Sequence, residues 1–520
     1  MGAGKSRVGR AVAARLGWPF ADGDALVEQH AGVPPHVLIE RSGEAALRAA
    51  EALAYAEFLD SGTGGFVLAC GGGAPLVPEV RERLADLDVI WLDVEADTAW
   101  ERVGADGTDR PLARDRAAFE ALLTARRAAY VALADERVDA SSPDVVEEIV
   151  RHVRSLEPGL HWVPHATGDY SVVVRAGGIT QVGERLAPRV PGSRAALVTD
   201  DGVPERLVAG VTDSLAGHFT VSVHRVPGGE ASKSWRQAGE LIEGLAADGL
   251  RRGDVVVALG GGVVGDLAGF AAATFLRGIR VCHVPTTLLA QVDSSIGGKT
   301  AVDLPQGKNL AGAIHQPVLV VSDPLALTSL PDREWRAGWA EVVKTALLAG
   351  SPLWGRVRDL EPMPAAEAGR VTDVIESCVV YKIGVVTFDE RETGQGSPRD
   401  RAVLNLGHTL GHAVEVAAPT LVHGEAVAIG LRAALTASVR VAGLDPAVAE
   451  ATNRWLDAWG LPASAPAGTD RARVAVAVAR DKKGEAETEW VLLAAPGEPR
   501  SGQTLPPELV DELVAAACPP

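Results

Sequence analysis

Short apolar runs alternate with amphipathic helical patterns through the first 156 residues of the chain. Apolar positions recur with helical spacing at 8–16, 44–59, 117–132 and 143–156, and apolar runs of strand length occupy 66–69 and 89–94. Strands that alternate with helices in this way build βαβ units. The pattern therefore predicts a small parallel α/β domain over residues 1–156.

The periodicity breaks at residues 157–166, where Pro158, Gly159 and Pro164 interrupt it, and we expect a linker there. A second alternation of strands and helices follows over 167–324. Its expected strands are 171–174, 194–199, 221–226, 254–259 and 280–284. Beyond residue 325 the patterns are almost wholly helical, which predicts an α-helical domain over 325–520.

The apolar run at 254–259 leads into a glycine-rich turn of the Rossmann type. Gly260, Gly262 and Gly265 have the spacing Gly-x-Gly-x-x-Gly, and a helical pattern follows at 266–274. Such a turn presents backbone N–H groups at a helix N-terminus, where the pyrophosphate of a dinucleotide binds. The acidic residue that usually follows about twenty positions later does not occur, so the ribose must be held from elsewhere. We predict a Rossmann-like nucleotide-binding domain over 167–324.

Three of the twelve histidines lie close together in the sequence, at positions 408, 412 and 423. His408 and His412 are one helical turn apart and therefore share a face. Two or three histidines with a carboxylate and one open position are typical of catalytic zinc, and Glu341 is a candidate carboxylate. The alternative is that the histidines only line a helix, which suits an isolated pair about equally well.

Cationic and amide side chains accompany this candidate metal site in the sequence. They are Lys344, Lys382, Arg401 and Asn405. A buried group of cations is costly without an anionic partner. The composition of the site therefore favours a substrate that carries negative charge.

Gly4, Lys5 and Ser6, placed directly before the helical pattern at 8–16, match the end of a phosphate-binding loop of the Walker A type. In such loops the lysine reaches the β- and γ-phosphates and the serine holds Mg²⁺. The match of three residues is weak by itself. The first glycine of the loop and the strand leading into it would precede Met1, so we expect that this start lies inside the loop and that the chain as written is a poor kinase.

Composition limits the partners and the compartment. The net charge of −18 disfavours nucleic acid and anionic membrane surfaces as partners. The four cysteines, Cys70, Cys282, Cys378 and Cys518, have no paired spacing, which suits a reducing cytoplasm. No apolar run reaches the length of a membrane span. We expect a cytoplasmic protein that acts on small molecules.

Seven motifs occur in the order found in 3-dehydroquinate synthases. They are GGGVVGD at 260–266, PTT at 285–287, QVDSSIGGK at 291–299, GKN at 307–309, EVVK at 341–344, NLGH at 405–408 and HGE at 423–425. The chain therefore resembles this family over roughly residues 167–500. The resemblance implies that a seven-carbon heptulosonate phosphate is converted into 3-dehydroquinate and phosphate, with NAD and Zn²⁺ or Co²⁺ as cofactors.

The same resemblance implies roles for individual residues. The metal ligands would be Glu341, His408 and His423, while His412 would contact the substrate or relay a proton. The substrate and its chemistry would involve Asp293, Lys299, Lys308, Asn309, Lys344, Lys382, Arg401, Asn405 and Arg277. NAD would be held by Gly260, Gly261, Gly262, Gly265, Asp266, Asp200, Glu230, Lys233, Thr286, Thr287, Lys299, Lys308 and Asn309.

The first 150 residues resemble shikimate kinase instead. The motifs are GAGKS at 2–6, DGD at 22–24, Arg48, GGG at 71–73 and RPL at 110–112. The resemblance implies phosphorylation of shikimate by ATP and Mg²⁺. ATP and Mg²⁺ would be held by Gly2, Gly4, Lys5, Ser6 and Asp22, and shikimate by Asp24, Arg48, Gly72, Gly73 and Arg126, with Arg110 as the lid residue.

Two other interpretations remain open from the sequence. A metal-dependent polyol or alcohol dehydrogenase shares the Rossmann-plus-helical plan but gives no reason for Lys299, Lys382, Arg401 and Asn405. A degenerate, non-catalytic kinase-like module would account for the incomplete loop. Separately, the synthase family places an arginine at Arg277 that reaches the partner subunit's substrate, which implies a homodimer through the synthase domain.

Overall fold

The computed structural model describes residues 2–16, 18–60, 66–85, 87–105, 115–156, 159–163, 170–392, 400–480 and 488–519. The chain divides into two compact units, Met1–Trp162 and Val163–Pro520. None of the helices in these ranges combines the length and the apolar content that crossing a membrane requires.

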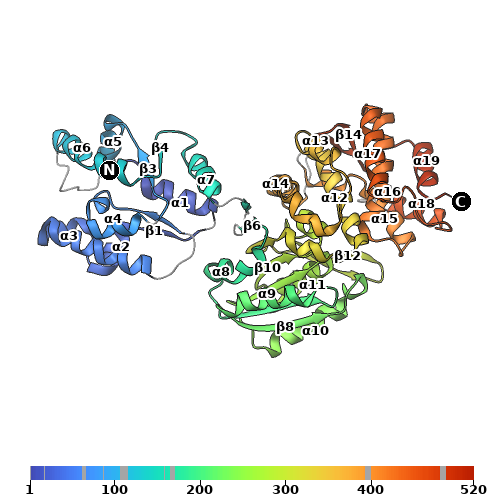
Figure 1. The fold of residues 1–520 in the computed structure, drawn as a ribbon, viewed down its shortest axis with the longest axis horizontal. Helices are drawn as coiled ribbons and strands as arrows, with labels where there is room; N and C mark the ends of the chain where they lie inside the picture. Colours follow the sequence, from blue (N-terminus) through green and yellow to red (C-terminus); the bar gives the residue numbers. More distant parts are fainter. Residues whose placement is uncertain are drawn as a thin grey trace. The chain divides into compact units, whose positions relative to one another are not determined.

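Helices and short parallel strands alternate in the first unit, as predicted (Figure 1). Its helices are α1 (Lys5–Leu16), α2 (Gly23–Ala31), α3 (Pro35–Asp60), α4 (Pro78–Leu84), α5 (Ala96–Ala105), α6 (Arg116–Leu133) and α7 (Val145–Leu156). β1 (Phe20–Asp22) pairs in parallel with β2 (Val67–Ala69), and β3 (Ile90–Asp93) with β4 (Glu136–Asp139). Helix α1 packs through Val8 and Val12 on a core that contains both Val67 and Ile90, so the two strand pairs share one core.

A seven-stranded sheet forms the centre of the second unit, in the order β5–β6–β13–β10–β9–β7–β8. Its strands are β5 (Leu160–Val163), β6 (Tyr170–Val174), β7 (Arg194–Asp200), β8 (Thr220–Val226), β9 (Val255–Gly260), β10 (Arg280–Pro285) and β13 (Leu319–Ser322). From β6 to β8 all neighbours are parallel. Every residue of β9 is buried, which explains its continuous apolar run. The five predicted strands are confirmed to within one residue at each end.

The strand order creates a switch point between β7 and β9. The chain runs outward from β7 to β8 and then crosses back to β9, after which β10 and β13 extend the sheet in the opposite direction. Thr199 pairs with Leu259, so Asp200 and the Gly260 turn lie at the same edge of the sheet. Crevices at the carboxyl ends of strands at such a point are where open α/β sheets bind ligands.

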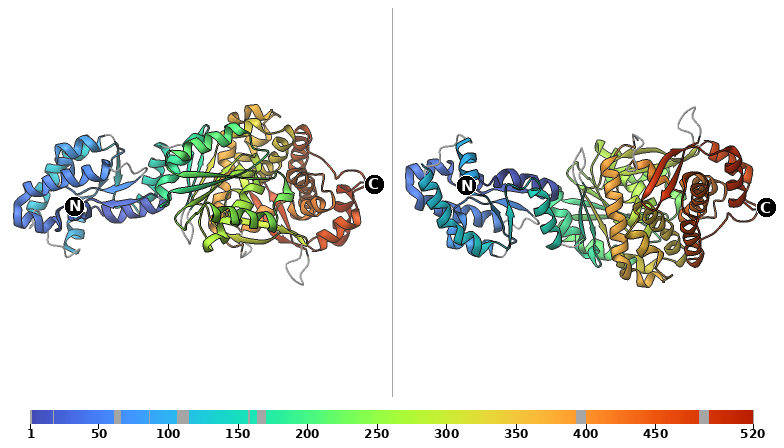
Figure 2. Two further views of the ribbon diagram at one scale, coloured as in Figure 1. Left: turned by 90° about the horizontal axis from the view of Figure 1, so that it is seen from below. Right: turned by 90° about the horizontal axis from the view of Figure 1, so that it is seen from above.

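Helices cover this sheet and build the rest of the unit. Those of the α/β part are α8 (Val182–Leu186), α9 (Glu205–Ala216), α10 (Trp235–Ala247) and α11 (Gly262–Thr274). Those that follow are α12 (Asp332–Ala349), α13 (Leu353–Arg358), α14 (Thr372–Phe388), α15 (His408–Ala417), α16 (His423–Ala437), α17 (Pro446–Ala458), α18 (Arg471–Arg480) and α19 (Pro507–Ala517). Figures 1 and 2 show this second group, in orange and red, gathered on one side of the sheet.

The helical half and the sheet share one hydrophobic core. Val172 of β6 and Val320 of β13 belong to the same buried cluster as Trp335 and Trp339 of α12. The Trp339 ring also lies 4.3 Å, between ring centroids, from Trp459, the residue that follows α17. Large aromatic side chains contribute most of the area buried in such a core.

Two hairpins and one further strand depart from the sequence prediction. β11 (Lys299–Leu304) and β12 (Gly307–Ile314) form an antiparallel hairpin that the pattern does not reveal, because the glycines and asparagine of β12 have low strand propensity. β14 (Trp490–Ala495) and β15 (Glu498–Gln503) form a second hairpin inside the predicted helical domain. A short apolar run such as that of β14 suits a buried helix equally well. Finally, β5 occupies residues 160–163 within the expected linker.

Glycines let α15 and α16 approach closely, and these two helices carry His408 and His423 at their first residues. A Cβ atom on Gly430 would stand 1.9 Å from the carbonyl oxygen of Gly407, and one on Gly411 would stand 3.1 Å from that of Ala426. Gly407 has a φ of 79°, which favours glycine. The separation of the two histidines is therefore set by backbone contact between the helices.

We predict that Gly430→Ala lowers the free energy of unfolding by about 1–3 kcal/mol, because the added methyl group forces the helices apart. Gly384→Ala is the matched control, since Gly384 lies in α14 with no atom within 4 Å of the new Cβ. That control should be neutral or stabilising by up to about 1 kcal/mol through helix propensity. Urea unfolding of both variants makes the comparison, and equal effects would contradict the proposed contact.

Candidate functional site

Glu341, His408 and His423 converge from three helices of the second unit. Glu341 lies on α12 and is 0% exposed, whereas the two histidines begin α15 and α16. His408 Nε2 and His423 Nε2 each lie 3.4 Å from Glu341 Oε1. One ligand atom from each residue falls within 4.8 Å of the others. Two imidazoles and a carboxylate thus face a common point.

The other nitrogen of each ring has its own acceptor. His408 Nδ1 lies 3.2 Å from the carbonyl oxygen of Leu406, and His423 Nδ1 lies 3.3 Å from Glu415 Oε2. A carbonyl and an ionised carboxylate can only accept hydrogen bonds, so both rings donate from Nδ1. Nε2 is therefore the nitrogen of each ring that faces Glu341, and it is the atom that would bind a metal ion after losing any proton it carries.

The carboxylate of Glu341 fits a metal ion. Neither of its buried oxygens has a hydrogen-bond donor of suitable geometry among the described residues. Lys344 Nζ lies 2.5 Å from Oε2, which is a close charge contact but not a well-directed hydrogen bond. Because a buried charge without directed partners is costly, and because two imidazoles with one carboxylate suit zinc, these residues are appropriate ligands for a divalent cation.

The charges of the first two ligands follow from burial and neighbours. Burial raises the pKa of the Glu341 carboxyl, but Lys344 and His408 outweigh it and hold that pKa well below its ordinary value. Burial and Lys344 both lower the pKa of His408, more than Glu341 raises it. At neutral pH Glu341 is therefore an anion and His408 a neutral ring, the protonation states in which both bind metals.

The other two histidines differ in charge. Burial lowers the pKa of His423, but Glu341 and Glu415 outweigh it and raise that pKa to about 10. Desolvation by the surrounding protein, followed by the electrostatic influence of the neighbouring His408 and His423 rings, lowers the pKa of His412 to about 3. The space between the two carboxylates thus attracts positive charge, while His412 is neutral at neutral pH.

Basic side chains lie beside these ligands. Lys382 of α14 forms an ion pair with Asp293, which lies on the short π-helix Ala290–Ser294. Burial raises the pKa of Asp293, but Lys382 and Lys344 outweigh it and lower the pKa to about 2. Arg401 donates to the carbonyl oxygens of Gly297 at 3.0 Å and Glu390 at 2.8 Å. The candidate substrate residues Asp293, Lys344, Lys382 and Arg401 are thus brought to one region.

Three further candidates are exposed. Lys299 begins β11 and lies 2.5 Å from Glu392 Oε2. Asn405 ends the 3₁₀ turn Arg401–Asn405 and is exposed. Arg277 lies on the turn Phe275–Arg277, with a φ of 67°, next to Leu276 with a φ of 52°. Two successive non-glycine residues in the left-handed region indicate a strained turn.

The glycine turn begins helix α11 and lies against Thr286 and Thr287. Gly261 is the N-cap of α11, and no side chain caps this helix within the described ranges. A Cβ atom on Gly261 would stand 3.0 Å from Thr287 Cγ2, and one on Gly260 would stand 2.6 Å from Val264. The first-turn amides and the positive end of the helix dipole therefore remain available for a pyrophosphate. Thr286 is buried, and its N–H donates to the carbonyl oxygen of Gly260 at 2.9 Å.

The remaining nucleotide-site candidates form a contact network around this turn. Lys233 forms an ion pair with Asp266 of α11 and donates a hydrogen bond to Asn309. Lys308 lies 3.2 Å from Glu230. Asp200, at the end of β7, accepts a hydrogen bond from the N–H of Gly202 at 2.8 Å. The structure thus brings together residues from the loops after β7, β8 and β9 and from β12.

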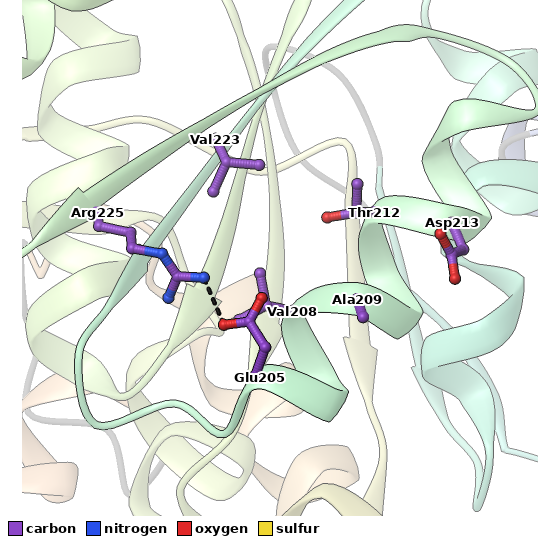
Figure 3. Close-up of a pocket in the computed structure, with 7 residues that line it drawn as sticks. All are labelled: Glu205, Val208, Ala209, Thr212, Asp213, Val223 and Arg225. Atoms are coloured by element: carbon purple, nitrogen blue, oxygen red, sulfur yellow. Dashed lines mark hydrogen bonds and ion pairs between the residues drawn. The ribbon is translucent and has the colours of Figure 1, made fainter.

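A separate hollow of about 570 Å³ lies away from these residues, on α9 and the edge strand β8 (Figure 3). Its lining residues are Glu205, Val208, Ala209, Thr212, Asp213, Val223 and Arg225. Arg225 pairs with Glu205 at 2.6 Å, so the main cation of this hollow is already neutralised. None of the candidate site residues lines it.

In the first unit, the phosphate-loop candidates begin α1. Gly2 and Gly4 have φ values of 70° and 74°, and Lys5 and Ser6 open the helix without an acidic residue in its first turn. Asp22 is the N-cap of α2, where its Oδ1 accepts from the N–H of Asp24 at 3.1 Å. The first-turn backbone amides of α1 therefore point toward the space before the helix, as a phosphate site requires.

Two arginines line the backbone of Gly72 and Gly73. A Cβ atom would stand 2.9 Å from Arg126 on Gly72 and 2.1 Å from Arg48 on Gly73. Burial lowers the pKa of Arg126, whose Nε has no acceptor among the described residues. Arg48 is paired with Glu51 at 2.7 Å. Arg48 also pairs with Glu44 at 2.6 Å, so Arg126 is the arginine here without a carboxylate partner among the described residues, and it fits the carboxylate of a ligand. Arg110 lies outside the described residues.

The sequence reasoning missed Glu415, although it lies on the same helix as two candidate histidines. Residues 408, 412 and 415 have the helical spacing of one face, so the signal was present. It also missed Glu392, the partner of Lys299, for which no local pattern exists.

Comparison with known proteins agrees with this arrangement. The shikimate kinase family matches residues 1–156, and the N-terminal and C-terminal parts of 3-dehydroquinate synthase match residues 223–337 and 338–484. The 3-dehydroquinate synthase of Lactiplantibacillus plantarum is 45% identical over 335 residues, which cover 64% of this chain and 91% of the relative. That of Latilactobacillus sakei is 42% identical over 336 residues, which cover 64% and 92%.

A solved structure shares the architecture of the second unit. It is a 2-deoxy-scyllo-inosose synthase complexed with carbaglucose-6-phosphate, NAD+ and Co2+, 28% identical, with a TM-score of 0.61 over 68% of this chain and 99% of that one. Taken with the family matches, this likeness places the chain in the 3-dehydroquinate synthase family, with a shikimate kinase domain joined to it in the same polypeptide.

Proposed function

We propose that the second unit converts 3-deoxy-D-arabino-heptulosonate 7-phosphate into 3-dehydroquinate and phosphate at the site around Glu341, and that the first unit transfers phosphate from ATP to shikimate. The observation that carries the synthase proposal is the convergence of Glu341, His408 and His423 beside a group of buried cations. We assign cofactor binding to residues 167–324, metal and substrate binding to 325–520, and the kinase reaction to 1–156.

Glu341, His408 and His423 would hold Zn²⁺ or Co²⁺, and the turn at Gly260–Gly262 would hold NAD. Support comes from the related synthase structure, which contains NAD+ and Co2+. When bound, NAD takes up and returns a hydride, and the metal polarises the substrate oxygens at the reacting carbons. Asp200 and Glu230 lie at the carboxyl edge of the sheet, where the adenosine end of NAD would be held.

The buried cations beside the metal ligands favour a substrate that carries negative charge. Lys344, Lys382 and Arg401 are all less than 8% exposed, so an anion bound among them interacts in a medium of low dielectric constant. Asp293 fixes Lys382 through their ion pair. With a divalent metal ion on Glu341, positive charge would exceed the buried carboxylates Glu341 and Asp293, and a phosphate and a carboxylate on one substrate would offset the difference. A simple polyol or alcohol would not, and this observation disfavours the dehydrogenase alternative.

His412 lies beside the metal ligands. It is exposed, its ring lies 5.0 Å from that of His408 between centroids, and its lowered pKa keeps it neutral. We assign it to contact the substrate or to relay a proton. Asn405 and Lys299, which are both exposed, would contact the substrate. Lys308 and Asn309 belong to the same hairpin as Lys299.

In the kinase unit, Arg48, Arg126 and the amides of Gly72 and Gly73 would bind the shikimate carboxylate. Asp24 would orient the hydroxyl group that receives the phosphate. Lys5 and Ser6 would contact the phosphates and Mg²⁺ of ATP, with Asp22 close to the metal. Positioning and charge stabilisation of this kind account for most of the catalysis in phosphoryl transfer.

We assign the synthase unit to a homodimer around the turn that carries Arg277. Apolar side chains are exposed on this turn and on β12: Leu276 is 39% exposed, Leu310 60% and Ile314 45%. Apolar side chains grouped in this way mark interaction surfaces. A two-fold interface there would let Arg277 reach the substrate of the partner subunit.

Removing divalent metal with a chelator should abolish phosphate release from the heptulosonate phosphate. Zn²⁺ or Co²⁺ should restore it, because imidazole and carboxylate ligands suit these ions. Mg²⁺, which prefers octahedral oxygen ligands, should not. The measurement is phosphate release by the dialysed enzyme, and full activity after metal removal would contradict the proposed site.

Mixing Arg277→Ala chains with Lys299→Ala chains tests donation across the interface. Each hybrid dimer would contain one intact site, so an equal mixture should regain about a quarter of wild-type activity if half of the dimers are hybrid. Each variant alone serves as the inactive control. Hybrid dimers that form but remain inactive would argue that Arg277 acts within its own subunit.

Replacing Arg126 by lysine should weaken shikimate binding by about tenfold or more, because lysine cannot reproduce a bidentate contact with a carboxylate. The dissociation constant measured by calorimetry is the readout, and ATP binding should not change. Arg127→Lys is the matched control, since Arg127 is the adjacent residue and its side chain is 52% exposed. If both changes weaken shikimate binding equally, Arg126 does not bind the shikimate carboxylate.

A further inference from the structure

Glu415 of α15 contacts His423, one of the candidate metal ligands, through the ring nitrogen that faces away from Glu341. Glu415 Oε2 lies 3.3 Å from His423 Nδ1, and on its other side Glu415 Oε1 lies 2.9 Å from Lys308 Nζ. His423 Nε2 in turn faces Glu341 at 3.4 Å. The contacts form a continuous line from β12 through α15 to the metal-binding nitrogen.

Glu415 is largely buried and is held by contacts on two sides. Its side chain is only 10% exposed, and both of its oxygens have a partner on a different element. His408, by contrast, donates to a backbone carbonyl. A carboxylate acceptor fixes the tautomer and the orientation of an imidazole, and it makes the ring a stronger ligand than a neutral acceptor does.

The hydrogen bond is needed because the position of His423 is not secured by burial alone. The side chain of His423 is 33% exposed, whereas that of His408 is 11% exposed. A ring at the first residue of a helix can turn about its own torsions. Without Glu415, the Nε2 lone pair of His423 would sample directions away from Glu341.

We propose that Glu415 is a positioning residue, which holds the His423 ring in its metal-binding tautomer, and that Lys308 fixes this carboxylate from the cofactor side of the unit. The proposal rests on the proposed function of Glu341, His408 and His423 as metal ligands. It adds Glu415 and Lys308 to the three ligands. Lys308 also lies 3.2 Å from Glu230, which belongs to the loop after β8, so β12 connects that loop to the metal ligands.

Another arrangement of the same residues requires consideration. His412, Glu415 and His423 also have one ligand atom each within 4.8 Å of one another. A second cation bound there would face the ammonium group of Lys308, which already occupies one oxygen of Glu415 at 2.9 Å. It would also displace the hydrogen bond from His423 Nδ1. Both contacts favour the positioning role over a second metal site.

The test measures metal binding directly. Metal-free full-length protein is titrated with Zn²⁺ in competition with a chromophoric chelator, and with Co²⁺ while the visible absorption bands are recorded. Wild-type protein should bind one ion per chain at the synthase site. Glu415→Gln keeps the size of the side chain but removes its charge, and it should weaken Zn²⁺ binding about tenfold to a hundredfold.

The same variant should shift the Co²⁺ absorption bands, because the geometry of one ligand changes. Lys308→Met should weaken Zn²⁺ binding in the same direction but by less, since it removes only the support of Glu415. Glu512→Gln is the control: this carboxylate pairs with Arg440 on the surface, with a side chain that is 57% exposed. It should leave both Zn²⁺ affinity and the spectrum unchanged.

Each result distinguishes the proposals. Wild-type affinity and an unchanged Co²⁺ spectrum in Glu415→Gln would overturn the positioning role while leaving the metal site intact. Two ions per wild-type chain, with one lost in Glu415→Gln, would identify Glu415 as a ligand and also overturn it. A wild-type protein that binds no Zn²⁺ would refute the metal site itself. If Glu415→Gln does not fold, unchanged Zn²⁺ affinity in Lys308→Met overturns the proposed link.

Discussion

A carboxylate removed entirely from water must be compensated by charge, and Glu341 organises the second unit around that requirement. Its side chain is 0% exposed and lies 2.5 Å from the ammonium group of Lys344. Two histidines reach it only because α15 and α16 touch through glycines. The position of the Glu341 carboxylate relative to the two histidines thus depends on the packing of α12, α15 and α16. The same packing places the three side chains where they could hold a metal cation.

The cofactor side of the unit obeys a different constraint. Parallel strands place their carboxyl ends at one edge of the sheet, and strand order reverses between β7 and β9, the point at which open α/β sheets bind ligands. The hairpin β11–β12 carries Lys299 and Lys308 beyond that edge. Lys308 contacts Glu230 from the loop after β8 and Glu415 from the helical half. The hairpin therefore connects the candidate cofactor-binding residues to the candidate metal ligands.

Much of this could be read from the sequence, and the exceptions have physical reasons. Continuous apolar runs located the parallel strands, because such strands are buried on both faces. The hairpin at 299–314 was missed, since its pairing depends on partners and not on local propensity. The spacing of His408 and His412 predicted a shared face but could not show that His423, from another helix, is the residue that meets Glu341. Glu415 had the right spacing, yet only the fold shows that its acceptor oxygen reaches His423.

The common core of the sheet and the helical half has a consequence for how this enzyme can be inherited or rebuilt. Val172 and Val320 pack in the same cluster as Trp335 and Trp339, so a cut between the cofactor half and the metal half would expose a large apolar surface on both pieces. Neither piece would be an independent module that natural recombination or a protein engineer could exchange. The nucleotide-binding half and the metal-binding half therefore belong to one folding unit.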